Sequence, residues 1–198
     1  MASITLPAAA LQTGGLRSLN ILRDLSAVAD LIELCFESTL DDEGESYLQQ
    51  MRRASRDHDF LKWAGKLMDS AAMPLSGFVW EEHGKIIGNA SLIYQFNLGR
   101  NIAMIANVAT HPDYRRRGIG RALTERAMAA ARLRGANEFW LHVRHDNPTA
   151  IKIYTDLGFT ERARRTTYYS RAGAGAMRPP SQAEALGGEA GDVVILYR

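Results

Sequence analysis

Arginine and glycine residues of a kind that could hold a phosphate group gather within residues 111–121. Gly118 and Gly120 stand at the start of a segment whose apolar residues recur with a period of about 3.6, as in a helix. Glycine lacks a Cβ, so a ligand can approach the backbone, and the unpaired amides and dipole of a helix N-terminus attract phosphate oxygens. The residues predicted to line this turn are Arg115, Arg116, Arg117, Gly118, Ile119, Gly120 and Arg121. Phosphate binding is the direct inference.

An apolar run supplies the strand that leads into this turn. Residues 102–108 are rich in β-branched and small side chains, and the run stops at residues 111–113, His-Pro-Asp. Taken alone, a glycine pair can be only a tight connection and an arginine run only a solvated face, but the strand before them favours a ligand site. The Gly-x-x-x-x-Gly-Lys-Ser/Thr loop is absent, and the third glycine of the dinucleotide fingerprint is missing, so these two phosphate loops are excluded.

A second stretch with chemical potential is residues 147–159, Asn-Pro-Thr-Ala-Ile-Lys-Ile-Tyr-Thr-Asp-Leu-Gly-Phe. On a helix, Asn147, Ala150 and Tyr154 are three or four positions apart and therefore share one side. The pattern also fits an amphipathic helix that Asn147 caps, with proline at its first position and glycine after its end. One side of this helix can face one ligand.

Both stretches resemble the GNAT superfamily of acetyl-coenzyme A dependent N-acetyltransferases. Residues 115–120 match its Arg/Gln-x-x-Gly-x-Gly/Ala signature, and residues 147–159 match its Asn-x-x-Ala-x-x-x-Tyr-x-x-x-Gly-Phe segment. The resemblance runs over about residues 16–169. It implies a single GNAT-type α/β domain, in which helices flank a central, twisted, mixed and mostly antiparallel sheet, and it implies acetyl-CoA as co-substrate.

The resemblance also implies a role for individual residues. The acetyl group would pass directly from the thioester to an amine, and Tyr154 would be the catalytic acid that protonates the leaving thiolate. The phosphate turn and the helix would hold the cofactor, and strand amides would orient its pantetheine arm. Beyond the turn, the implied cofactor-binding residues are Val108, Ala109, Thr110, Asn147 and Ala150.

The general base is not assigned. Many GNAT enzymes carry a glutamate on the strand that enters the phosphate loop, but the corresponding segment here, residues 105–110, offers only Asn107. The replacement candidates are Glu81, Glu82, His142, Asp146 or a chain of water molecules.

Composition limits the remaining possibilities. A chain of 198 residues that is 46% apolar can bury one substantial core, so we expect an N-terminal arm at residues 1–15 and one domain at 16–198. The net charge of +2 argues against a nucleic-acid partner, and no apolar segment approaches the length of a membrane span. Cys35, the single cysteine, is expected to pack in the core. We expect a cytoplasmic protein without a signal peptide, a membrane partner or a metal site.

Periodicity and turn residues predict the order of elements. A strand at 16–22 precedes a helix capped by Asp24 or Ser26, whose buried side carries Val28, Leu31, Ile32, Leu34, Cys35 and Phe36. Further helices are predicted at 41–55 and 58–72, and strands at 77–82, 85–96 and 101–110. A helix at 118–134, a strand at 138–143 reached by a parallel crossover, and a helix at 147–157 follow. Strands at 159–169 and 192–197 enclose a long loop or insert at 171–191 and would pair as a hairpin.

The acceptor amine stays open. Acidic residues at 41–45 could attract a cationic amine, but they also suit the solvated start of a helix. The acceptor could be a small molecule or a peptide, and a homodimer is compatible with the family. Two alternatives remain: a non-catalytic acyl-CoA binding or sensing module, and a nucleic-acid binder that uses the basic residues 115–134.

Overall fold

The computed structural model describes residues 15–40, 42–57, 76–97, 100–168 and 190–198. The chain divides into two compact units, Met1–Asn137 and Glu138–Arg198. The expected helix at 58–72 lies outside the described residues, and so do nearly all of the expected N-terminal arm and of the long loop at 171–191. None of the helices described is long and apolar enough to cross a membrane.

The first unit begins with a short strand, β1 (Leu16–Ser18), and a helix, α1 (Ile21–Phe36). Asn20 caps α1, because its side chain accepts a hydrogen bond from the amide of Leu22 at 3.1 Å. The predicted caps, Asp24 and Ser26, are therefore wrong. Asp24 lies inside the helix, where its buried carboxylate accepts the backbone N–H of Asn20 at 2.8 Å.

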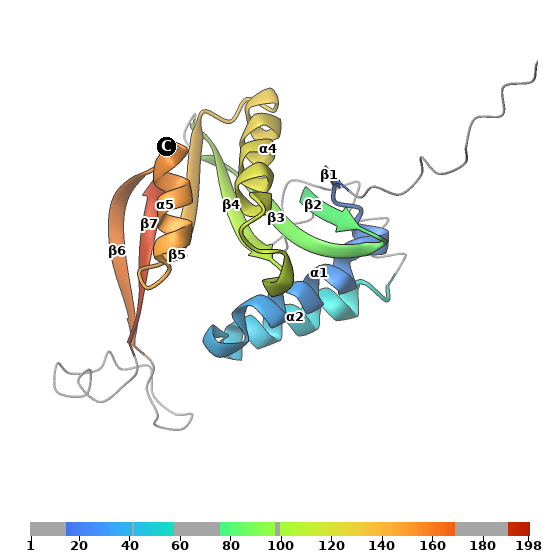
Figure 1. Ribbon diagram of the computed structural model, residues 1–198. Coiled ribbons are helices and arrows are strands. Elements are labelled where there is room, and N and C mark those ends of the chain that lie inside the picture. Colours follow the sequence, from blue (N-terminus) through green and yellow to red (C-terminus); the bar gives the residue numbers. More distant parts are fainter. Residues whose placement is uncertain (1–14, 41, 58–75, 98–99, 169–189) are drawn as a thin grey trace, which may run out of the picture. The chain divides into compact units, whose positions relative to one another are not determined.

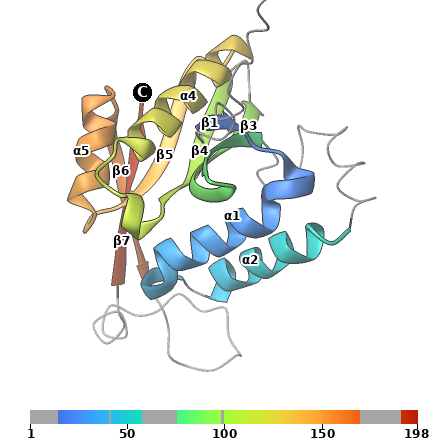
Figure 2. The same cartoon turned by 45° about the vertical axis from the view of Figure 1, so that its right-hand side comes forward.

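Two further helical segments follow α1. A 3-10 turn, η1 (Glu37–Thr39), leads to α2 (Asp42–Ala54), close to the predicted bounds. Helices α1 and α2 lie side by side (Figure 1, Figure 2), and Leu25, Val28 and Ile32 pack with Leu48 and Met51 in one buried cluster. The predicted buried stripe of α1 is wrong at one position, since 47% of the Leu34 surface is exposed.

Four antiparallel neighbours make the sheet of the first unit, in the order β1, β2 (Ser76–Glu82), β3 (Lys85–Asn97) and β4 (Arg100–Thr110). His83 and Gly84 form the predicted turn between β2 and β3, both with positive φ. The strands predicted at 77–82, 85–96 and 101–110 match these bounds to within one residue at each end. The strand predicted at 16–22 is too long, because β1 ends at Ser18 and α1 begins at Ile21.

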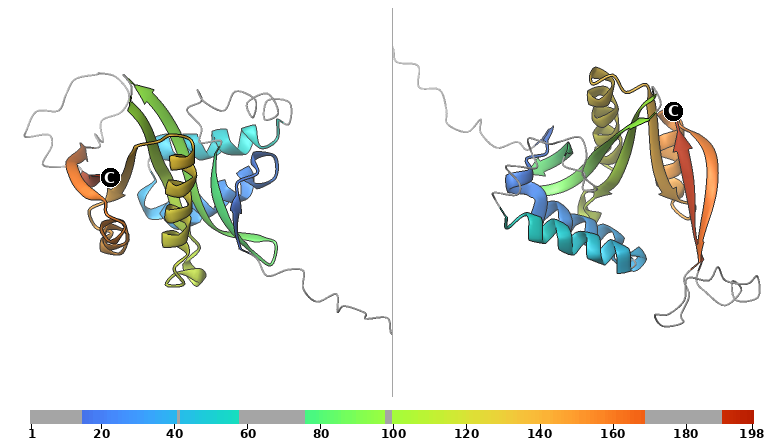
Figure 3. Two further views of the ribbon diagram at one scale, coloured as in Figure 1. Left: turned by 90° about the horizontal axis from the view of Figure 1, so that it is seen from above. Right: turned by 180° about the vertical axis from the view of Figure 1, so that it is seen from behind.

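Helices cover both faces of this sheet. Helix α4 (Ile119–Leu133) packs on one face and α1 with α2 on the other (Figure 3). Gly88 of β3 lets α4 come close, because a Cβ at that position would lie 2.7 Å from Ile119 and 2.9 Å from Leu123. The start of α4 is thus seated directly on the sheet.

The second unit contains β5 (Glu138–Arg144), α5 (Pro148–Asp156), β6 (Thr160–Tyr168) and β7 (Ala190–Tyr197). β7 pairs antiparallel with β5 and with β6, which confirms the predicted pairing of the last two strands. The buried side chains of the second unit are Phe139, Leu141, Val143, Tyr154, Leu157, Phe159, Val194 and Leu196. The predicted parallel crossover from β4 to β5 would join the two units and stays a prediction.

Candidate functional site

The turn before α4 has the backbone of an anion site. His111 caps a short 3-10 turn, η2 (Pro112–Tyr114), and the chain then reaches Gly118, whose φ of 77° is left-handed. The first bond of the helix runs from the N–H of Ala122 to the carbonyl of Gly118, at 3.0 Å. The amides of residues 119–121 therefore have no partner within the helix and can donate to a ligand.

Space at the two glycines is open in the way the sequence predicts. A Cβ built on Gly118 meets no atom within 4 Å, and one built on Gly120 comes no closer than 3.5 Å to Oγ1 of Thr110. Between them, Ile119 is only 1% exposed and anchors the first helical turn in the core. A ligand can approach the glycines from outside while Ile119 holds the backbone still.

The four arginines of the turn are exposed but differ in their partners. Arg117 forms an ion pair with Glu82 of β2 at 2.7 Å, and Arg121 pairs with Glu125 at 2.9 Å. Arg115 reaches the carbonyl of Thr110 at 3.4 Å, and no carboxylate in the described part of the chain pairs with Arg115 or Arg116. Those two guanidinium groups keep their charge available for a phosphate, whose geometry suits their paired N–H donors.

A bulge interrupts β4 just before the turn. Asn89 of β3 faces Ala109 and Ser91 faces Ala106, so β4 carries one extra residue between those pairs. Within it, Asn107 has a φ of 50°, which is uncommon for a residue other than glycine. The bulge breaks the regular ladder beside Val108, where the pantetheine arm is predicted to bind.

The bulge is held by side chains rather than by the ladder. Asn89 donates from Nδ2 to the carbonyl of Asn107 at 2.8 Å, and Asn107 donates from Nδ2 to the Tyr47 hydroxyl of α2 at 3.0 Å. Asn89 is fully buried, and its Oδ1 has no hydrogen-bond partner among the residues the structure describes. An unpaired buried acceptor is costly, so its presence beside a strained backbone marks this bulge as a candidate functional position.

The amide of Thr110 lies on the edge of β4 away from β3. Residue 111 donates its N–H to the carbonyl of Ile87 at 2.9 Å, and alternate residues of an antiparallel strand bond to the same neighbour. The Thr110 carbonyl points the same way as its amide, since Sγ of Cys35 donates to it at 3.3 Å. Cys35, predicted as a core residue, is half-buried on α1, and its thiol is occupied by this bond.

In the second unit the helix α5 is formed as predicted. Asn147 caps it by accepting the Ala150 amide at 3.0 Å, and Gly158 beyond its end has a φ of 86°. Tyr154 is 6% exposed and packs edge-on against Phe159, with ring centroids 6.1 Å apart. Burial raises the pKa of Tyr154 to about 12, so its phenol is protonated at neutral pH.

The candidates for the general base differ in their ion-pair partners. Glu81 accepts hydrogen bonds from Arg17 and Arg23, Glu82 is paired with Arg117, and Asp146 is paired with Arg144 at 2.7 Å. A hydrogen bond from Arg144 lowers the pKa of Asp146, which weakens it as a base. His142 is exposed on β5 between the buried side chains of Leu141 and Val143.

Sequence reasoning missed Tyr47 and Asn89. Both are separated in sequence from their contact at Asn107, by 60 and 18 residues, so no local spacing could reveal them. A polar pair in β3, at positions 89 and 91 among apolar neighbours, was the available signal.

A comparison with protein families now identifies the class. Residues 26–159 match the model of the acetyltransferase (GNAT) family. The chain therefore belongs to the GNAT family of acetyltransferases, and the predicted fold class is confirmed.

Individual relatives refine this picture. The [ribosomal protein bS18]-alanine N-acetyltransferase of Escherichia coli strain K12 is 45% identical over 67 residues, which are 34% of this chain and 45% of that enzyme. The matched segment thus spans less than half the length of this relative. The crystal structure of the Escherichia coli ribosomal-protein-S18-alanine N-acetyltransferase superimposes with a TM-score of 0.59 at 25% identity, covering 93% of this chain and 92% of that one.

A second solved structure shows the same fold at lower identity. The yncA protein of Salmonella typhimurium, solved with its cofactor acetyl-CoA, gives a TM-score of 0.60 at 18% identity and covers 94% of this chain and 93% of its own.

Proposed function

We propose that this protein is an N-acetyltransferase that moves the acetyl group of acetyl-CoA directly to a primary amine. The observation that carries the proposal is the turn at residues 115–120, where unpaired helix amides, open space at two glycines and two exposed arginines converge. These features fit a pyrophosphate, and family membership indicates which cofactor carries it.

Each proposed role follows from the contacts of one residue or element. The amides of residues 119–121 and the charges of Arg115 and Arg116 bind the pyrophosphate, while the outward amide of Thr110 and the bulge at Val108 orient the pantetheine arm. When bound, acetyl-CoA supplies the thioester that the amine attacks, so the enzyme needs no nucleophile of its own. Tyr154 keeps its proton at neutral pH and donates it to the departing thiolate sulfur.

The remaining cofactor contacts lie in the second unit. Asn147 and Ala150 at the start of α5 are proposed to contact coenzyme A. Because the Asn147 carbonyl oxygen already caps the helix, the side-chain NH₂ is the group left for the cofactor.

For the base we propose His142 or a water chain. The three carboxylate candidates are each bound by arginine, so neither Glu81, Glu82 nor Asp146 is well placed to take a proton. A neutral imidazole can accept the proton that the ammonium of the acceptor must lose before it attacks.

We propose a polypeptide amine as the acceptor, in preference to a small molecule. The Escherichia coli relative acts on the alanine of a ribosomal protein, and it matches this chain in sequence and in structure. A cytoplasmic location, and assembly as a homodimer, would be compatible with such a substrate and stay predictions.

The first test is a calorimetric titration with acetyl-CoA, beside Gly120→Trp as the control. Micromolar binding that the control loses would place the cofactor on the turn. The second is release of free thiol with a peptide whose N-terminus is alanine, compared with the same peptide N-acetylated and with a panel of small amines. Thiol release with the free peptide alone supports the peptide acceptor, and release with a small amine alone contradicts it.

The alternative is an acyl-CoA binding module without catalysis. It is motivated by Asn107, which stands on the strand where many members of the family carry a glutamate. Acetyl-CoA would then raise the unfolding temperature, but no amine in the panel would release thiol.

A further inference from the structure

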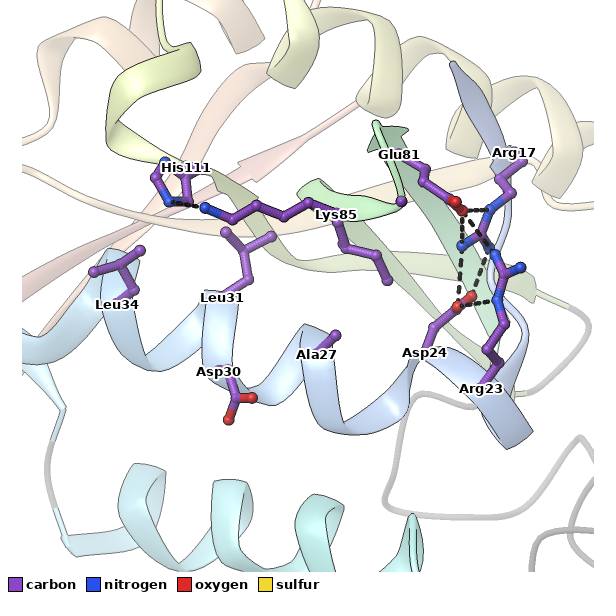
Figure 4. A pocket seen from close by; sticks show the side chains of 12 residues that line it. Arg17, Arg23, Asp24, Ala27, Asp30, Leu31, Leu34, Glu81, Lys85 and His111 are labelled. Atoms are coloured by element: carbon purple, nitrogen blue, oxygen red, sulfur yellow. Dashed lines mark hydrogen bonds and ion pairs between the residues drawn. The ribbon is translucent and has the colours of Figure 1, made fainter. Parts of the chain in front are cut away.

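A cavity of about 530 Å³ lies in the first unit, beneath the tip of the β2–β3 hairpin (Figure 4). Helix α1 contributes one wall through Ala27, Leu31 and Leu34, and the hairpin contributes Glu81, Lys85 and Ile86. Its volume falls in the range of small-molecule sites, about 300–1,000 Å³. Of the residues of the turn and the bulge, only His111, the cap of η2, lines this cavity, and none of the proposed cofactor contacts does. The cavity can therefore bind a ligand of its own.

One end of the cavity is a closed ion-pair network. Arg17 donates to Asp24 at 2.6 Å and to Glu81 at 2.7 Å, and Arg23 donates to the same two carboxylates at 3.0 and 2.7 Å. Two cations thus neutralise two anions. The other lining carboxylate, Asp30, is paired with Arg52 of α2 at 2.9 Å. None of these groups is left to attract a charged ligand.

The other end carries one uncompensated cation. Nζ of Lys85 lies 2.9 Å from Nε2 of His111, and no carboxylate in the described part of the chain pairs with Lys85. A lysine ammonium carries three N–H donors, so one contact with His111 leaves others free. Two further N–H groups of Lys85 remain for a ligand.

The imidazole is oriented by its other nitrogen. Nδ1 accepts the backbone N–H of Asp113 at 3.3 Å, and a carboxylate oxygen of the same residue lies 3.7 Å from it. His111 is only 9% exposed, so the lysine is fixed against a largely buried partner. Lys85 itself is exposed, so its ammonium is open to a ligand while the contact with His111 holds it at this end of the cavity.

An apolar wall separates the two ends. Figure 4 shows Leu31 and Leu34 of α1 beside Lys85 and His111, with Ala27 further along towards the ion-pair network. Leu34 is 47% exposed although it lies on the face that lines the cavity, which is the surface an apolar ligand would cover. The cationic end and the apolar wall of the cavity together suit an amphipathic anion as ligand.

We propose that this cavity binds an aliphatic monocarboxylate, with its carboxylate on Lys85 and its chain along Ala27, Leu31 and Leu34. One uncompensated ammonium matches one negative charge, which favours a carboxylate over a phosphate dianion. The site is independent of the proposed acetyl transfer, because none of its residues is assigned to the cofactor or to the acceptor.

The test is an NMR titration of the full chain with octanoate, using octylammonium and octyl phosphate as charge controls. We expect saturable shifts of the Leu31 and Ile86 signals with octanoate, none with octylammonium, and no tighter binding of octyl phosphate. Lys85→Gln should weaken octanoate binding at least tenfold, whereas Lys152→Gln on α5 should leave it unchanged.

A second variant guards against a misfolded first one. Ala27 is exposed, so Ala27→Trp can fill the cavity without disturbing the core, and it should abolish the octanoate shifts. Shifts confined to residues 107–110 and 115–121, equal binding of octylammonium, tighter binding of octyl phosphate, or full affinity in Ala27→Trp would each overturn the proposal.

Discussion

At the scale of single residues, the protonated phenol of Tyr154 is the proposed proton donor for the leaving thiolate. Tyr154 is buried, and burial raises its pKa to about 12, so the resting phenol is protonated throughout the physiological range. A residue with that property is a donor and never a base near neutral pH. The acid and base roles must therefore belong to different side chains.

Tyr154→Phe is expected to lower turnover by roughly 100-fold, the lower range of general acid catalysis. The dissociation constant for acetyl-CoA should change little, because the ring and its contact with Phe159 are kept. Steady-state kinetics and calorimetry measure the two effects separately. Unchanged turnover would assign the proton to water.

His142→Gln tests the base. We expect turnover to fall and the acidic limb of its pH profile to disappear, because glutamine cannot take a proton from the acceptor. His145→Gln, also exposed and three residues away, is the matched control and should keep the wild-type profile. If both variants keep that limb, a water chain carries the proton instead.

At the scale of elements, the turn at residues 115–120 and helix α4 show which features local sequence signals can predict. Residues 115–120 and the bounds of α4 could be predicted, because the glycine pair and the helical period are local signals. The cap of α1 could not, because Asn20, Asp24 and Ser26 are all capable caps. The Asp24 carboxylate is instead occupied by Arg17, Arg23 and the backbone N–H of Asn20. The exposure of Leu34 also depends on tertiary packing.

Alanine at the two glycines of the turn should act in opposite directions on stability. Gly118→Ala places a Cβ on a left-handed residue and should lower the free energy of unfolding by about 1 kcal/mol. Gly120→Ala lies inside the helix with its Cβ 3.5 Å from Thr110, and should raise that free energy by roughly 0.5 kcal/mol. Urea denaturation measures both, and equal effects would contradict the assigned backbone.

Asp24 links α1 to β1 in a way that acid should reveal. Burial raises the pKa of this carboxyl, but hydrogen bonds from Arg17, Asn20 and Arg23 outweigh it and hold the pKa below its usual value. A lowered pKa contributes stability above the unfolded pKa of about 3.9, and that contribution is lost as pH falls below it.

Asp24→Asn should therefore lower the free energy of unfolding at neutral pH by about 3 kcal/mol and flatten its fall below about pH 4. Asp156→Asn breaks the exposed pair with Lys152 and is the matched control, with an expected change of about 0.5 kcal/mol or less. Chemical denaturation across pH provides both curves. A variant that keeps the wild-type slope in acid would remove Asp24 from this role.

At the scale of the whole molecule, the proposed cofactor-binding and catalytic residues are divided between the two units. The phosphate turn and the bulge belong to the first unit, and Tyr154, Asn147 and His142 belong to the second. The two motifs could be recognised separately in the sequence, but the side chains that hold the bulge could not, since Tyr47 comes from a helix remote in sequence.

Acetyl-CoA at 100 times its dissociation constant should stabilise the folded chain by about 2.7 kcal/mol. Thermal unfolding with and without the cofactor measures this, and single-stranded RNA serves as the control for a nucleic-acid partner. With a net charge of +2, the chain should show little stabilisation by RNA at physiological salt. Stabilisation by RNA alone would reverse the functional assignment.

The bare backbone at Gly88 has a consequence for anyone screening variants of this protein. A methyl group there would press on Ile119 and Leu123 and should displace α4, whose first amides are proposed to bind the phosphate. We expect this to be measured as lost cofactor affinity, although position 88 is not one of the proposed cofactor contacts. A screen that scores only activity would count Gly88 among the cofactor-binding residues, although its role is to position the helix that carries them.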